Sequence, residues 1–167
     1  MLGEDPVAMR RLLKFLHTVG AIGLMGSMAS LLAMLYVAPP ASELAAYGQL
    51  RIAMGEVATW VFFPSLGLTL IAGLASIAVT RAFHNAGWAW LKAGSGILVF
   101  ESGFIGVLGP MQQEAERSAK ALAGALDPAM LAQSLSAERG TLWVLIGVAA
   151  ANVALGVWRP RLTRRVA

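Results

Sequence analysis

The chain has 167 residues, of which 57% are hydrophobic and only 13% are charged, and its mean hydropathy is +0.68. This composition excludes an ordinary soluble domain and predicts an all-α, polytopic membrane protein. The sequence contains no cysteine, which excludes disulfides and cysteine-ligated metal sites. The formal net charge of +4 is expected to serve membrane topology and contact with anionic lipids rather than nucleic-acid binding.

Four apolar stretches come close to, or exceed, the length that a helix needs to cross a bilayer. A hydrocarbon core about 30 Å thick requires roughly 20 helical residues. The stretches cover residues 12–38, 57–80, 88–108 and 141–158. Membrane-spanning strands would show period-two alternation, which these runs lack. We therefore predict a four-helix bundle that forms one membrane domain over residues 1–167.

The first stretch follows Arg10, Arg11 and Lys14, as the apolar part of a cleaved signal peptide would. Signal peptides, however, have apolar regions of about 7 to 15 residues, and this run is nearly twice as long. We expect it to stay in the protein as a helix that ends before Pro39 and Pro40.

The links between the stretches predict how the helices are arranged. The short link 81–87 predicts that the second and third helices are antiparallel neighbours. Pro64 is expected to kink the second helix. Residues 110–140 are expected to form an outer, amphipathic helical loop that lies on the bilayer, caps the bundle or faces a partner. Its expected parts are a helix over 111–126, a break at Asp127 and Pro128, and a short helix over 129–137.

The distribution of basic residues predicts that both termini are cytoplasmic. With this orientation nine of the 13 basic residues lie inside and four lie outside, as the positive-inside tendency requires. The four outer residues are Arg51, Arg117, Lys120 and Arg139. The basic tail over 159–165 is expected to anchor the last helix at the cytoplasmic surface.

Polar side chains at membrane depth are the candidates for function, because a charged residue costs about 2.5 to 3.5 kcal/mol at a helix centre. The candidates are His17, Lys92, Glu101 and Asn152, with Glu56 and His84 nearer the interfaces. His17 and Lys92 each lie a few residues into their helices from the cytoplasmic side. Both should therefore occupy one layer, roughly 6 to 9 Å below the surface.

His17 shares a helix face with Gly20, Leu24 and Ser27, so its imidazole is expected to look along a groove of small residues. Haem b would suit such a groove, with His17 as the axial ligand to the iron. Lys92 would contact a propionate or occupy the second ligand site. Alternatively, His17 hydrogen-bonds a neighbouring helix and Lys92 extends to the headgroups.

Two further ligand arrangements are weaker. Bis-histidine ligation by His17 and His84 requires the second helix to continue past Thr80. Copper binding could use thioethers, although methionine in an apolar helix is more often core filler. The methionines concerned are Met25, Met28 and Met34.

Glu101 is a carboxyl group at membrane depth and requires a hydrogen-bond partner. It stands about 180° around the helix from Lys92, so these two side chains cannot pair. Asn152 on the fourth helix is the expected partner. Glu101 either relays protons to a quinone or a cavity, or simply hydrogen-bonds as a neutral acid.

Small residues mark helix faces on which backbones can approach closely. They are Gly23 with Ser27 and Gly26 with Ser30 on the first helix, and Gly96, Gly103 and Gly106 on the third. Packing within the chain is the main expectation for these faces. A homo-oligomer that forms through them is the alternative.

Three short runs carry a resemblance to a known group of proteins. They are LKFLHTVGAI over 13–22, WAWLK over 88–92 and LGP over 108–110. They resemble uncharacterised bacterial four-helix membrane proteins, distantly similar to the copper-resistance protein CopD and to the short, membrane-type protoporphyrinogen oxidase of haem synthesis. The resemblance covers about the first 110 residues and implies a multi-pass protein of the bacterial inner membrane.

In the protoporphyrinogen oxidase family, a histidine in the first helix and a lysine near the start of a later helix are associated with haem binding. The matching positions here are His17 and Lys92. That family typically follows its histidine with a tryptophan and a Pro-Arg step, whereas this chain reads GLMGSM over 23–28. The difference argues against the oxidase activity itself, and no catalytic residue is assigned.

Two functions follow from these observations. In the first, the bundle binds haem or a porphyrin in a cytoplasmic-side layer through His17 and Lys92. In the second, it is a non-catalytic accessory or structural subunit of a larger membrane complex. That subunit would contact its partners through the Gly-rich faces and the segment 110–140.

Overall fold

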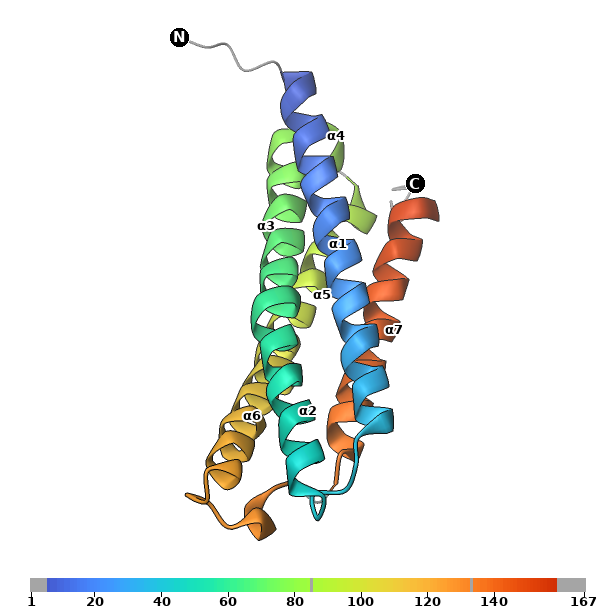
Figure 1. Cartoon of the computed structure of the whole chain (residues 1–167). Helices are drawn as coiled ribbons and strands as arrows, with labels where there is room; N and C mark the ends of the chain where they lie inside the picture. Colours follow the sequence, from blue (N-terminus) through green and yellow to red (C-terminus); the bar gives the residue numbers. More distant parts are fainter. Residues whose placement is uncertain (1–5, 85, 133, 159–167) are drawn as a thin grey trace.

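The structure is a computed structural model that describes residues 6–158, except residues 85 and 133. Four long apolar helices run side by side (Figure 1), and the described residues include no strand, which confirms the all-α four-helix class. The start of α1 and the end of α7 lie at the same end of the bundle, here called the terminal end. The opposite end is called the loop end. The predicted basic tail over 159–165 lies outside the described residues.

Two of the four long helices are made of several elements. In chain order the elements are α1 (Pro6–Val37), α2 (Leu44–Val57), a π-helical turn η1 (Ala58–Phe62), α3 (Phe63–Val79), α4 (Arg81–His84), α5 (Gly87–Gly103), a second π-helical turn η2 (Phe104–Leu108), α6 (Gly109–Leu122), a 3-10 turn η3 (Pro128–Met130) and α7 (Ser136–Trp158). The elements α2, η1 and α3 form one continuous helix of 36 residues, and α5, η2 and α6 form another. Each is about 54 Å long, so it exceeds a hydrocarbon core by roughly 24 Å.

Each continuous helix contains a proline just after its π-helical turn. Phe63 N–H bonds the Ala58 carbonyl and Gly109 N–H bonds the Phe104 carbonyl, five residues back in both cases. This wider turn accommodates Pro64 and Pro110, whose rings lack an N–H and would crowd the preceding turn of a regular helix. The structure thus places a π-helical turn just before Pro64, where the sequence predicted a kink. Pro110 lies in the first turn of α6, so the third membrane helix continues past residue 108, where the predicted stretch ended.

The outer segment differs from its prediction in two places. α6 ends at Leu122 rather than at 126, because Gly124 has a φ of 73° and closes the helix. Ala125 N–H donates to the Lys120 carbonyl at 2.8 Å and Gly124 N–H donates to Ala121 at 3.0 Å, which is a Schellman cap. The predicted short helix over 129–137 is wrong, since 128–130 form a 3-10 turn and α7 begins only at 136.

The helices pack as a ring in which α1 and α5 each contact both α3 and α7. α3 and α5 are neighbours, as their short link predicted. Large buried side chains gather in the loop-end half of this ring: Met28, Leu31, Leu35, Met54, Phe62, Leu66, Val107, Met111 and Leu142. Lipid is as apolar as this core, so burying these side chains away from lipid gives no hydrophobic gain. The helices are therefore held together by dispersion contacts among these side chains.

Candidate intramembrane polar site

His17 is anchored to α3 by a hydrogen bond. Its Nδ1 lies 2.8 Å from the carbonyl oxygen of Thr69, on the next helix of the ring. A carbonyl oxygen only accepts, so Nδ1 carries the proton and donates it. The ring also lies against Gly73, where an added Cβ would come within 3.2 Å of Nδ1. This bond fixes the ring orientation and leaves Nε2 as the second ring nitrogen.

The small-residue face of α1 does not form the open groove that the sequence predicted. A Cβ at Gly20 would come within 2.8 Å of the Thr69 backbone nitrogen, and one at Gly23 would collide with the Ser65 side chain. Gly20, Leu24 and Ser27 are buried on the predicted face, but α3 covers it. A flat ligand therefore cannot lie along this face, because the backbones of α1 and α3 approach too closely.

Lys92 enters the same layer from α5 and extends toward α7. Its Nζ lies 2.9 Å from the place where a Cβ on Gly156 would stand. The His17 side chain rests on α3 and the Lys92 side chain on α7, so the two residues predicted to share a layer contact different helices.

The bundle interior around this layer is lined by small side chains. Of the residues that the structure describes at this end, the buried ones are Gly20, Ala72, Ala89 and Ala93. The large buried side chains begin nearer the loop end, from Leu24 onward. The terminal half therefore lacks the bulky core that fills the loop half.

His84 caps the end of α3 instead of joining His17. Its Nε2 donates to the Ile77 carbonyl at 3.0 Å and to the Ala78 carbonyl at 3.3 Å, both in the last turn of α3. A bis-histidine axis with His17 is not formed.

The predicted pairing of Glu101 with Asn152 is wrong. The Ser95 hydroxyl donates to the Asn152 Oδ1 at 2.7 Å, which joins α5 to α7. Glu101 lies exposed on the outside of the bundle, and across the described part of the chain its carboxyl has no hydrogen-bond or ion-pair partner. The methionines considered for copper belong to the core, since Met28 is fully buried and Met25 packs against the same cluster.

A second polar cluster lies at the loop end and was not predicted from the sequence. Arg51 is fully buried and forms a bidentate ion pair with Glu138, with both N···O distances at 2.7 Å. Tyr47, one turn earlier on α2, donates to Glu114 of α6 at 2.8 Å. The backbone N–H of Ala132 donates to the same carboxyl oxygen at 2.8 Å. These bonds join α2 to α6 and to the first turn of α7, and they attach the segment between α6 and α7 to α6.

One signal in the sequence could have indicated this cluster. Tyr47 and Arg51 are four residues apart, as are Glu114 and Ser118, so each pair lies on one face of its helix. All four side chains are buried, because these two faces meet.

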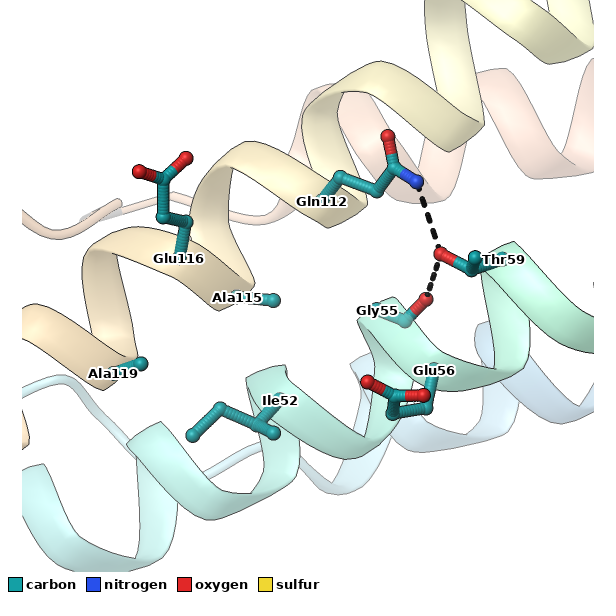
Figure 2. A pocket seen from close by; sticks show the side chains of 8 residues that line it. All are labelled: Ile52, Gly55, Glu56, Thr59, Gln112, Ala115, Glu116 and Ala119. Carbon is teal, nitrogen blue, oxygen red and sulfur yellow. Dashed lines mark hydrogen bonds between the residues drawn. The ribbon is translucent and has the colours of Figure 1, made fainter.

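An open groove of about 270 Å³ runs between α2 and α6 on the outside of the loop end (Figure 2). Within it the Thr59 hydroxyl donates to the Gly55 carbonyl at 2.8 Å, and the Gln112 amide donates to Thr59 at 3.0 Å. The carboxylates of Glu56 and Glu116 belong to opposite walls. The groove is narrow where Gly55 lets α2 approach α6, since a Cβ there would lie 2.6 Å from the Cβ of Ala115.

No group of three or more potential metal ligands among histidine, cysteine, aspartate and glutamate occurs in the described ranges. Comparison with protein-family models, with curated proteins and with solved structures gave no match for this chain.

Proposed function

We propose that this protein binds haem or a related porphyrin in the terminal half of its membrane domain, with His17 as the axial ligand. The observation that carries the proposal is the 2.8 Å hydrogen bond from His17 Nδ1 to the Thr69 carbonyl. In a histidine that binds a metal, one ring nitrogen typically donates its N–H to such an acceptor. This bond orients the ring and leaves the other ring nitrogen for the metal. Thr69 would thus act as the residue that positions His17.

Two further features support a porphyrin in this layer. The Lys92 ammonium extends from α5 toward Gly156 of α7 and can pair with a propionate. The buried residues around the layer are small, and a flat ligand would lie on the α5 and α7 side of His17, because α3 covers the other face. When bound, haem would supply one-electron redox chemistry.

A haemin titration of the detergent-purified protein, followed at the Soret band, tests this proposal. His17→Gln retains an amide donor for Thr69 but removes the ligand nitrogen, and it should weaken binding at least 100-fold. Lys92→Gln should weaken it about tenfold, the loss of one charge-assisted contact. His84→Gln is the matched control and should bind like the wild type. Equal binding by His17→Gln and the wild type would contradict the proposal.

A second candidate function is a non-catalytic accessory subunit, and the groove between α2 and α6 favours it. Glu56 and Glu116 stand on opposite walls of the groove, and Glu116 is paired with Lys120, so Glu56 is the acidic group that a partner could meet. The groove would suit a basic segment of a partner protein. If this function is correct, Glu56→Gln with Glu116→Gln should abolish co-purification of a partner that the wild type retains. Unchanged co-purification would refute this role of the groove.

A further inference from the structure

Arg139 lies on the ring of an aromatic side chain at the loop end, where the end of α1 meets the start of α7 (Figure 1). Its guanidinium carbon stands 5.2 Å from the centroid of the Tyr36 ring. The Tyr36 hydroxyl in turn accepts a hydrogen bond of 3.1 Å from the indole N–H of Trp143, one turn beyond Arg139 on α7. These three side chains therefore join the last turn of α1 to the first turns of α7.

The guanidinium of Arg139 has no anionic partner in the part of the chain that the structure describes. Glu138 is the adjacent acidic residue, and both of its carboxylate oxygens already accept hydrogen bonds from Arg51. The Nε of Arg139 is buried, and no described residue accepts a hydrogen bond from it. The N–H donors of this guanidinium are therefore open to an acceptor that the described chain does not supply.

The length of α7 places Arg139 at a surface of the bilayer. At a rise of about 1.5 Å per residue, the helix is about 28 Å long between Arg139 and Trp158, close to the hydrocarbon thickness of about 30 Å. Trp158 is exposed at the terminal end, and Tyr36 and Trp143 are exposed at the loop end. Exposed aromatic side chains of this kind are typical of the two membrane surfaces. Arg139 thus lies at the headgroup level of the loop-end leaflet.

We propose that Arg139 binds the phosphate group of a phospholipid in the loop-end leaflet. A guanidinium can pair with two phosphate oxygens through parallel N–H···O bonds, and its flat face rests on the Tyr36 ring. The exposed Trp143 indole contacts the upper part of the acyl chains. Because Arg139 and Tyr36 belong to different helices, the bound lipid stabilises the joint between α1 and α7. This site is at the opposite end of the bundle from His17, so the proposal is independent of haem binding.

Fluorescence of Trp143 tests the proposal, because this indole lies next to the site. Phenylalanine replaces the other tryptophans, which are Trp60, Trp88, Trp90 and Trp158. Phosphatidylglycerol with brominated acyl chains is then titrated into detergent micelles that contain this single-tryptophan protein, and the quenching of Trp143 is recorded. Adding Arg139→Gln should raise the lipid concentration for half-quenching at least tenfold, because a charge-assisted contact is lost.

Two substitutions of Tyr36 separate the role of its ring from that of its hydroxyl. Tyr36→Leu should raise the half-quenching concentration about threefold, whereas Tyr36→Phe keeps the ring under the guanidinium and should bind like its parent. Arg117→Gln, which removes an exposed cation of α6 at the same end, is the matched control and should change nothing. Circular dichroism confirms that each variant is folded.

Two further titrations identify the group that is bound. Brominated diacylglycerol has the same chains without a phosphate and should need at least a tenfold higher concentration for half-quenching. Inorganic phosphate should not relieve the quenching by phosphatidylglycerol. Equal quenching in Arg139→Gln and its parent, or equal quenching by the two lipids, would overturn the proposal. Displacement of the lipid by inorganic phosphate would also overturn it, since the site would then serve a free anion.

Discussion

The buried ion pair at the loop end allows a quantitative prediction. Replacing Glu138 by glutamine removes the charge that faces Arg51, whose side chain is 0% exposed, while Glu138 itself is 15% exposed. Leaving a buried charge without its partner costs about 3 to 5 kcal/mol in proteins. Glutamine can still accept one hydrogen bond, and Glu138 is slightly exposed. We therefore expect a loss near the lower limit, about 3 kcal/mol of unfolding free energy.

The assay is reversible unfolding in detergent micelles, followed by circular dichroism. Glu116→Gln is the matched control, because Glu116 pairs with Lys120 at 2.6 Å while both side chains are more than half exposed. It should not change stability measurably. The double variant Arg51→Met with Glu138→Leu removes both charges and should lose much less than Glu138→Gln. If Glu138→Gln were as stable as Glu116→Gln, the buried pair would not hold the loop end together.

Three further substitutions test other parts of the structure, all by unfolding in detergent. Gly20→Ala should lower the free energy of unfolding by about 1 to 3 kcal/mol, because its Cβ would meet the α3 backbone. The control Gly67→Ala lies in open space and should leave this free energy unchanged. Equal losses of stability in the two variants would contradict the close approach of α1 and α3. Tyr47→Phe should cost about 1.5 to 3 kcal/mol by removing the bond to Glu114, and no loss would show that bond to be absent. Phe62→Ala should cost about 3 to 5 kcal/mol, since Phe62 is fully buried, and a loss below 1 kcal/mol would place it outside the core.

The fold class could be predicted because a bilayer imposes one demand on every crossing segment. Each stretch had to be long, apolar and helical, and hydropathy alone reveals that. The ends of the helices could not be found in this way. α6 is polar and continues the third membrane helix beyond the hydrocarbon region, where its pairing with α2 stabilises it. Such an extension depends on a tertiary contact, which hydropathy does not report.

The polar sites were predictable only in part. Depth along the helix placed His17 and Lys92 in one layer, but it could not show that the Thr69 carbonyl would hold the imidazole or that α3 would close the small-residue groove. The pairing of Arg51 with Glu138 joins residues 87 positions apart, and no local pattern records it. Long-range polar contacts depend on how each helix is rotated about its own axis. In this chain that rotation is set by the packing of the apolar faces, which the sequence alone does not give.

The most direct test of the proposed function is a reduced-minus-oxidised visible spectrum of the protein purified from cells supplied with ample haem. We expect a Soret band and an α-band in the wild type, and their loss in His17→Gln while the secondary structure stays intact. A colourless wild type, or bands that persist without His17, would contradict the account of His17 as the axial ligand.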